Sequence, residues 1–202
     1  MKYINTLTGQ YPITETEIRA EYPNTSFPEV FVAPQPYAIV LQIPLPTFNQ
    51  ITHTCVEGDP VYTTKLHWEQ TWVVTAKPSD QLAAEKLATQ EAKWEAIKAE
   101  RDRRVVNGVK VGNDWFHSDT FSRTQQLGLV MMGANMPAGI QWKTMDATFV
   151  TMTPALATQI FQATALADTT LFARAEEKHQ AMLAMADPSP YDVMAGWPET
   201  HA

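Results

Sequence analysis

The alternation of apolar and polar residues changes character along this chain of 202 residues. Over residues 61–75, apolar side chains recur at every second position, which is the period of a strand with two unlike faces. Residues 79–104 lack glycine and proline, and their apolar positions recur in steps of three and four, as in a helix. The pattern predicts an α+β protein. It would comprise a β-rich domain over 1–76, a connecting helix over 79–104, a small α+β domain over 105–186 and an extended tail over 187–202.

The N-terminal region is expected to combine one short helix with strands. Thr14 can cap a helix within residues 13–22, because Glu17 follows at the spacing of a capping box. The segment 34–46 has the pattern of a strand, and the prolines near its two ends favour an edge position in the sheet.

A long hairpin is predicted to follow. Its arms would be residues 50–57 and 61–75, with the turn at the Gly-Asp-Pro sequence of residues 58–60. Several aromatic residues share the even-numbered face of the second arm. We interpret this face as hydrophobic core, with a docking surface as the alternative. Its candidate interaction residues are Tyr62, Trp68 and Trp72.

The apolar positions of the helix 79–104 form a narrow stripe. Such a stripe is typical of a coiled-coil seam or of a helix packed along a partner. At 1.5 Å per residue the helix would be roughly 39 Å long, which suits a connector. Its charged residues mix both signs, as on a solvated helix face. The candidate interaction residues on the stripe are Leu87, Trp94 and Ile97.

Residues 105–133 are predicted to form a tight hairpin followed by a helix. The Gly-Asn pair at residues 112–113 suits a two-residue hairpin turn. Ser118 is expected to cap the helix, with Asp119 in its first turn. Gly133 is expected to end it.

A second hairpin, over residues 140–152, is predicted to lead into a long helix. Its turn would lie at residues 145–146. Thr153 suits the N-cap of the helix and Pro154 its first position. A restart capped by Asp168 would break this helix, and that alternative stays open.

The segment 114–119 concentrates residues of the types that bind metals or transfer protons. Asp114, His117 and Asp119 lie close together in it. Each also has a structural role to fill, in a turn, at a strand end or at a helix cap. A metal site normally needs three or four converging ligands and an ordered second layer around them. We therefore predict no metal site and no catalytic residue here.

The remaining motifs also favour a protein that is not an enzyme. Glu176 and His179 have the Glu-x-x-His spacing of di-metal helical bundles, but the spacing occurs once, whereas such bundles use it twice. The nucleophile elbow, the phosphate-binding glycine loop and the dinucleotide-binding glycine motif are absent from the sequence. No cofactor is expected.

Charge and cysteine content limit the kinds of partner and bound group that are expected. A net charge of −7 disfavours a nucleic-acid partner. The single cysteine, Cys55, permits neither an intramolecular disulfide nor a zinc site built from thiolates. The N-terminal residues have no apolar core of a secretory signal, and no window reaches the length of a membrane span. We expect synthesis in a cytosol and no membrane insertion.

The tail, residues 187–202, is rich in proline but also carries large apolar groups, which a purely disordered tail usually lacks. Two interpretations stay open. The tail is either disordered or docked in extended form on a neighbouring chain. Its candidate interaction residues are Tyr191, Met194 and Trp197.

Two stretches of the C-terminal half resemble a domain of unknown function that is common in tailed bacteriophages and prophages. They are NGVKVGNDWFHSDTFSRTQQLGLV at 107–130 and IQWKTMDATFVTMT at 140–153. The resemblance spans about residues 104–183. The segments 3–28 and HWEQTW at 67–72 also resemble the leader region of such phage proteins. The family pattern usually has Asp-Gly where this chain has Ala147 after an aspartate, which favours a different turn type.

Because that domain often occurs in tail-fibre or tail-fibre-assembly proteins, the resemblance implies a virion structural protein of the tail. It would be a component of the tail fibre, tail tip or baseplate that acts by protein–protein assembly. The alternative is a tail-fibre assembly chaperone, and a third reading is an enzyme acting on host-surface glycans. The resemblance carries over no catalytic residues. Expected partners are other phage tail proteins, with the chain as a homo-oligomer or in several symmetric copies. It would be made in the host bacterial cytoplasm and located in the virion tail.

Overall fold

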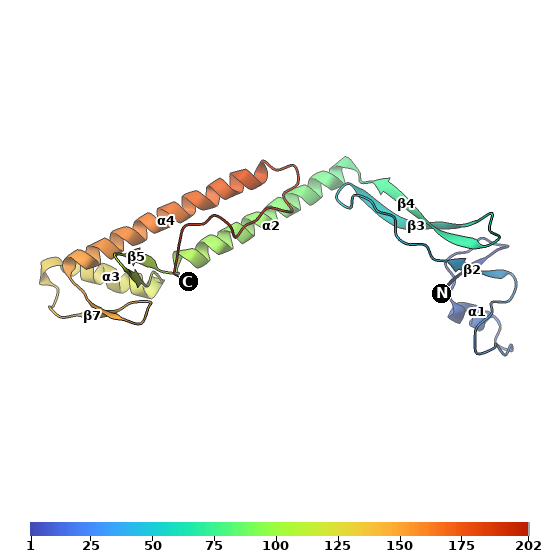
Figure 1. Ribbon diagram of the computed structural model, residues 1–202, viewed down its shortest axis with the longest axis horizontal. Coiled ribbons are helices and arrows are strands. Elements are labelled where there is room, and N and C mark those ends of the chain that lie inside the picture. Colours follow the sequence, from blue (N-terminus) through green and yellow to red (C-terminus); the bar gives the residue numbers. More distant parts are fainter. Residues whose placement is uncertain (202) are drawn as a thin grey trace. The chain divides into compact units, whose positions relative to one another are not determined.

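The chain divides into two compact units, Met1–Leu82 and Ala83–Ala202. The computed structural model describes residues 1–201 (Figure 1). The first unit holds a four-stranded sheet with one short helix, and the second holds long helices with two small hairpins. The predicted α+β class is therefore confirmed. Within residues 1–201, no helix combines the length and the hydropathy needed to cross a membrane.

The first unit is a mixed sheet with a short helix packed on it. In sheet order its strands are β1 (Lys2–Asn5), β2 (Tyr37–Leu41), β4 (Trp68–Ala76) and β3 (His53–Tyr62), and the helix is α1 (Glu15–Glu21). Only the β2–β4 pair is parallel. Ile18 of α1 is fully buried against Tyr3 and Tyr37, which form the core of this unit together with Ile13.

The predicted capping box of α1 is confirmed. The Thr14 hydroxyl accepts a hydrogen bond from the Glu17 N–H (3.3 Å), and the Glu17 carboxylate accepts one from the Thr14 N–H (2.7 Å). These two bonds satisfy N–H groups that a helix start otherwise leaves without partners.

The prediction that β2 is an edge strand is wrong. β2 lies between β1 and β4, and the edges of the sheet are β1 and β3. Pro36 and Pro44 lie just outside the paired residues of β2, so neither removes an N–H from the hydrogen-bonded ladder. The prolines therefore mark the two ends of the strand and carry no information on its position in the sheet.

The predicted turn of the β3–β4 hairpin is also wrong. The chain reverses at residues 63–67, where the Thr63 N–H donates to the His67 carbonyl (2.9 Å). Residues 58–60 lie inside β3, where the register shifts between Gly58 and Val61. Glycine and proline mark a β-bulge here, which they do as readily as a turn. A Cβ added at Gly58 would lie 2.7 Å from the Thr71 hydroxyl, so this close approach requires glycine.

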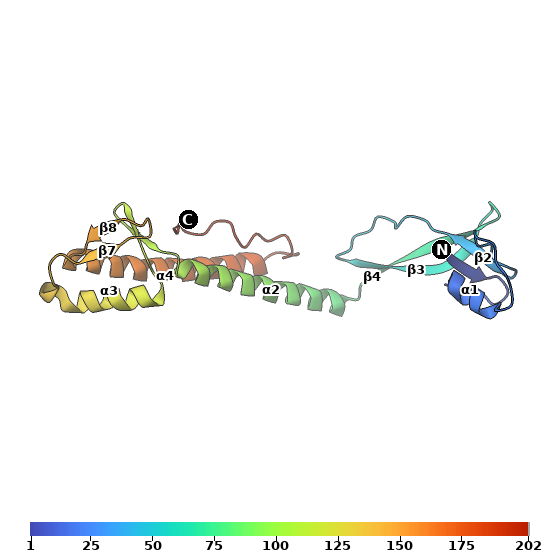
Figure 2. The ribbon, with the colours of Figure 1, turned by 90° about the horizontal axis from the view of Figure 1, so that it is seen from below.

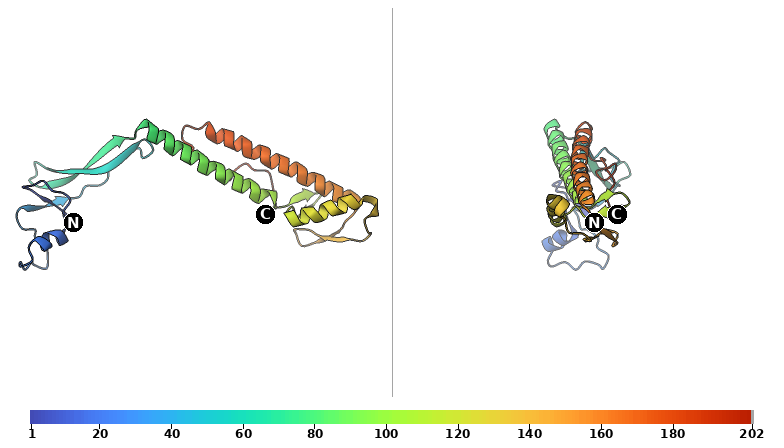
Figure 3. Two further views of the ribbon diagram at one scale, coloured as in Figure 1. Left: turned by 180° about the vertical axis from the view of Figure 1, so that it is seen from behind. Right: turned by 90° about the vertical axis from the view of Figure 1, so that its left-hand side faces the viewer.

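The second unit is built on a pair of long helices. Its elements are α2 (Ser79–Val105), β5 (Val109–Val111), β6 (Asp114–Phe116), α3 (Thr120–Met132), the 3-10 turn η1 (Gly133–Asn135), β7 (Gln141–Lys143), β8 (Phe149–Thr151) and α4 (Pro154–Leu183). α3 packs along α4, and α2 lies beside α4 (Figures 2 and 3). The core joins the two hairpins to α4 through Val109, Phe116, Met136, Met152, Ala157 and Ile160.

Several local predictions in this unit are confirmed. The β5–β6 hairpin turns at residues 112–113, with Gly112 at a φ of 64°. Gly133 is the C-cap of α3. The Thr153 hydroxyl caps α4 by accepting from the Leu156 N–H (3.1 Å), and Pro154 occupies the first turn.

One prediction about a helix end is wrong, and one open alternative is decided. The N-cap of α3 is Asp119, whose carboxylate accepts from two backbone N–H groups, whereas Ser118 is fully buried. The Ser118 hydroxyl accepts from the Gly108 N–H and donates to the Val105 carbonyl, each at 2.8 Å. α4 is continuous over Pro154–Leu183, so the alternative of a restart at Asp168 does not occur. The carboxylate of Asp168 pairs with Arg123.

Candidate functional site

Among the ligand-type residues of segment 114–119, Asp119 has a structural role as the N-cap of α3. The Asp119 carboxylate accepts from the N–H groups of Phe121 (3.0 Å) and Ser122 (3.1 Å). Hydrogen bonds from Ser122, its hydroxyl above all, lower the pKa of Asp119. Among the described residues, no group of three or more histidine, cysteine, aspartate or glutamate side chains could hold a metal ion.

The aromatic residues of the β3–β4 hairpin lie at the surface or half-buried. Tyr62 and Trp68 are paired across the strands, with ring centroids 5.5 Å apart, and Tyr62 is 56% exposed. The Trp72 indole N–H donates to the Ile43 carbonyl (3.2 Å). The segment after β2 therefore covers part of this face.

The other face of the same sheet carries apolar side chains that the sequence analysis did not single out. Directly paired residues of neighbouring strands point to the same face. Val56 pairs with Val73, and Leu41 and Val61 both pair with Glu69. We define the apolar sheet face by its five large exposed side chains, which are Ile39, Leu41, Val56, Val61 and Val73. Val73 lies within the period-two pattern of β4, but this pattern does not indicate which residues of the neighbouring strands pair with it.

The stripe on α2 is filled largely by the protein's own α4. The ring of Trp94 stacks on the imidazole of His179, with centroids 4.0 Å apart. Ile97 is fully buried, whereas Leu87 is 56% exposed. The structure thus brings Trp94 onto α4, buries Ile97 and leaves Leu87 on the surface.

The tail turns back after α4 and runs along α2 and α4 of its own chain (Figure 1). The tail therefore docks on its own chain, whereas the sequence pattern left open a tail that docks on a neighbouring chain. Four cationic side chains hold the backbone of the tail. Lys93, Lys178, Arg174 and Arg104 donate to the carbonyls of Tyr191 (2.9 Å), Asp192 (3.2 Å), Gly196 (2.7 Å) and Pro198 (2.9 Å), respectively. We call the surface formed by these four cations the tail groove.

Two aromatic rings of the tail anchor it in the tail groove. The Lys178 ammonium lies 5.4 Å from the ring centroid of Tyr191 and 5.6 Å from that of Trp197, distances at which a cation is attracted to a ring face. Lys178 is only 5% exposed, and this burial lowers its pKa. Burial also raises the pKa of Tyr191. Met194, between the two anchors, is exposed.

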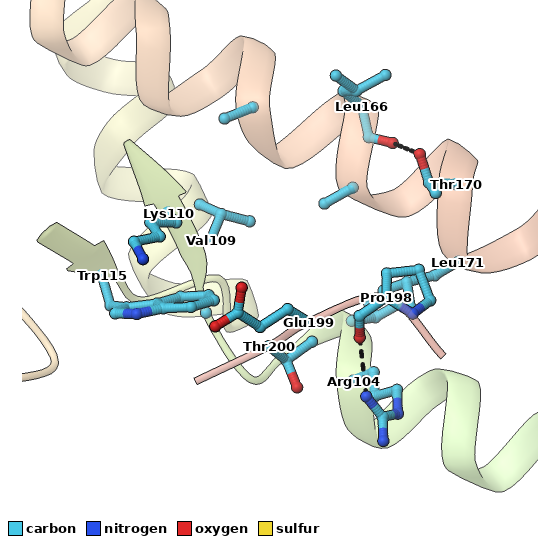
Figure 4. Close-up of a pocket in the computed structure, with 14 residues that line it drawn as sticks. Arg104, Val109, Lys110, Trp115, Leu166, Thr170, Leu171, Pro198, Glu199 and Thr200 are labelled. Atoms are coloured by element: carbon cyan, nitrogen blue, oxygen red, sulfur yellow. Dashed lines mark hydrogen bonds between the residues drawn. The ribbon is translucent and has the colours of Figure 1, made fainter. Parts of the chain in front are cut away.

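The end of the tail borders a cavity of about 280 Å³ (Figure 4). Apolar side chains from α2, β5, β6 and α4 form most of its wall, among them Val105, Val109 and Leu166. The polar groups at the cavity include the guanidinium of Arg104 and the carboxylate of Glu199. The volume is near the lower end of the range of ligand pockets, about 300 Å³. The tail thus forms one side of the cavity.

These features define an α+β protein whose second unit is a helical pair with its own C-terminal segment bound along it. The chain belongs to the family described as domain of unknown function DUF4376, which matches residues 88–195 and thus more than half of the chain. The match includes the packed part of α2 and most of the tail. The family description carries no functional information, so the expectation of a phage tail protein stays a prediction. Neither a curated protein nor a solved structure matches the chain significantly.

Proposed function

We propose that the protein is a virion structural protein of a bacteriophage tail, in the fibre, tip or baseplate, and that it acts by protein–protein assembly. The observation that carries this proposal is the apolar sheet face. Val56 and Val73 are directly paired, and 58% and 48% of their respective surfaces are exposed. Exposed groups of apolar side chains on a sheet are typical of interaction surfaces. The resemblance of residues 107–130 and 140–153 to phage tail-associated proteins points to other tail proteins as the partners.

A tail-fibre assembly chaperone is the second candidate, and the same face supports it, because a chaperone also needs exposed apolar surface for incompletely assembled subunits. An enzyme acting on glycans is disfavoured by the cavity at the tail. Glycosidic hydrolysis normally uses two carboxylates, and Glu199 is the single carboxylate that residues 1–201 place on the cavity's wall.

Mass spectrometry of purified virions tests the proposal. A structural component is expected in mature particles at a constant ratio to the other tail proteins. Absence from mature particles, with presence in assembly intermediates, would favour the chaperone and overturn the structural assignment.

Substitutions on the apolar sheet face test whether this surface is needed for incorporation into particles. The double variant Val56→Glu/Val73→Lys is expected to lose incorporation into particles. The two new charges are opposite in sign and directly paired, so the strands stay compatible. Val30→Lys is the matched control, because Val30 is exposed but lies in a loop outside the sheet. If both variants were incorporated equally, the apolar sheet face would not be required for assembly into the particle.

A further inference from the structure

The tail groove recognises its occupant mainly through the backbone. Each of its four cations donates to a main-chain carbonyl of the tail. Such contacts depend on the path of the backbone, which turns at residues 193–196 with Gly196 at a φ of 74°. They depend little on which side chains the segment carries. Selectivity comes from the two aromatic anchors, Tyr191 and Trp197, which lie six positions apart in the sequence. The groove therefore fits a segment with two aromatic residues at this spacing and a turn between them.

Charge adds to this selectivity. The segment 187–201 carries Asp187, Asp192 and Glu199 and has no lysine or arginine. It meets a groove whose four defining side chains are all cationic. The opposite charges of the segment and the groove favour their encounter, whereas a basic segment would be repelled by the groove. The occupant that fits is thus an acidic segment with two aromatic anchors, and every copy of this chain carries one.

The connection between α4 and the first anchor is held by short-range bonds. The Met185 N–H donates to the Met182 carbonyl (3.2 Å), and the Tyr191 N–H donates to the Pro188 carbonyl (3.1 Å). The Ser189 N–H donates to the carboxylate of Asp187 (2.9 Å). Pro188 and Pro190 disfavour continuation of the helix. Straightening this connection breaks these few local bonds and leaves the contacts between tail and groove unchanged.

We infer that the tail groove of one copy binds the C-terminal segment of a second copy, so that neighbouring copies exchange tails. Such exchange of an identical segment is an inexpensive route to dimers. The tail's own groove competes, because a short connection gives the attached tail an effective concentration in the millimolar range. A dilute solution of the wild-type chain is therefore expected to contain monomers. Exchange becomes favourable where copies are held close together or where the attached tail cannot occupy its own groove.

Two complementary full-length variants test this inference. The first, Tyr191→Ala/Trp197→Ala, has a disabled tail and an intact groove. The second, Arg174→Glu/Lys178→Glu, has an intact tail and a disabled groove. Each alone is expected to be a monomer, and an equimolar mixture at high micromolar concentration is expected to form a heterodimer, measured by light scattering and native mass spectrometry. A chain that carries all four substitutions has neither an intact tail nor an intact groove. It is therefore expected to form no heterodimer with either of the two variants.

A mixture that stays monomeric, while both variants show native circular dichroism, would overturn the inference. If either variant fails to fold, the wild-type chain provides the test. A protease site inserted between Ala186 and Asp187 allows the connection to be cut after folding. A labelled peptide of residues 187–202 is then expected to replace the cut tail, and failure of the peptide to enter would reject the exchange. Both experiments use purified chains, so their outcome is independent of whether the protein belongs to a virion tail.

Discussion

Trp94 on α2 stacks on the imidazole of His179 on α4, with the ring planes only 12° from parallel. Beside this contact, the Lys98 ammonium lies 5.6 Å from the centroid of the Trp94 ring. One turn further along α2, the guanidinium of Arg101 lies 4.3 Å from the ring centroid of Phe172. A narrow stripe that is typical of a seam between two chains is thus largely filled within one chain.

The first prediction concerns the stability that this internal packing supplies. Ile97→Ala removes a fully buried side chain from the contact of α2 with the rest of its unit. We expect a loss of about 2–5 kcal/mol in the free energy of unfolding, from lost burial and from the cavity left behind. Urea denaturation followed by far-ultraviolet circular dichroism measures it. Leu87→Ala is the matched control on the same helix. Leu87 is 56% exposed, so the control should change stability by less than about 0.5 kcal/mol.

Equal effects of Ile97→Ala and Leu87→Ala would contradict the internal packing of α2. A large effect of Leu87→Ala that appears only at high protein concentration would instead indicate that the exposed part of the stripe joins two chains.

The second prediction concerns the fit of the tail in its groove. Gly196 has a φ of 74°, and an added Cβ would lie 2.6 Å from a guanidinium nitrogen of Arg174. Gly196→Ala is therefore expected to introduce backbone strain of about 1–2 kcal/mol and to displace the Arg174 contact. Gly139→Ala is the matched control. Gly139 has a φ of 80°, with no atom within 4 Å of the added Cβ, so it introduces strain alone.

Hydrogen exchange of the backbone amides in segment 191–201 distinguishes the two glycine variants. Gly196→Ala should raise exchange in this segment, and Gly139→Ala should leave it at the wild-type level. Unchanged protection of the tail in Gly196→Ala would mean that the contact between Gly196 and Arg174 contributes little to docking.

The parts of the fold that could be predicted from the sequence are those decided by neighbouring residues. The capping box of Thr14 and Glu17 and the cap of Thr153 before Pro154 each depend on residues at most three positions apart. Their hydrogen bonds form within one helical turn, so the sequence pattern contains the whole interaction.

The errors arise where distant residues decide. The sequence around Gly58 is compatible with a turn or a bulge, and the register against β4 selects the bulge. The true turn contains Leu66 at a φ of 61°, a conformation for which leucine gives no local signal. Docking of the tail depends on contacts such as that of Arg104 with the Pro198 carbonyl, 94 residues apart in the sequence. Because every residue carries a backbone carbonyl, the sequence does not indicate which carbonyl will accept such a bond.

The third prediction concerns acid stability. Glu100 is 5% exposed, and hydrogen bonds from Arg103, the larger cause, and from Arg104 lower its pKa. A carboxyl whose pKa is lower in the folded state stabilises the fold above its unfolded pKa, about 4.3 for glutamate, and loses this contribution as the pH falls through the folded value. The free energy of unfolding should therefore decrease below about pH 4, and the decrease should be smaller in Glu100→Gln.

Urea denaturation at a series of pH values, followed by circular dichroism, measures the acid-dependent decrease. Glu95→Gln is the control, because it removes a carboxylate that is 72% exposed from the same helix. If Glu100→Gln and Glu95→Gln gave the same pH dependence, the pairing of Glu100 with the two arginines would not contribute to acid stability.

The last prediction concerns the turn between β7 and β8, where the chain departs from the Asp-Gly pattern that it resembles. Ala147 has a φ of 60°, and its N–H donates to the Thr144 carbonyl (3.2 Å). Alanine is strained in this conformation and glycine is not, so Ala147→Gly should raise the free energy of unfolding by about 1 kcal/mol. The same substitution at Ala173, an exposed position within α4, should lower it by about 1 kcal/mol, because glycine weakens a helix. Thermal and urea unfolding of the two variants should thus shift in opposite directions. A loss of stability in both would show that the unfolded-chain entropy of glycine outweighs the strain at Ala147.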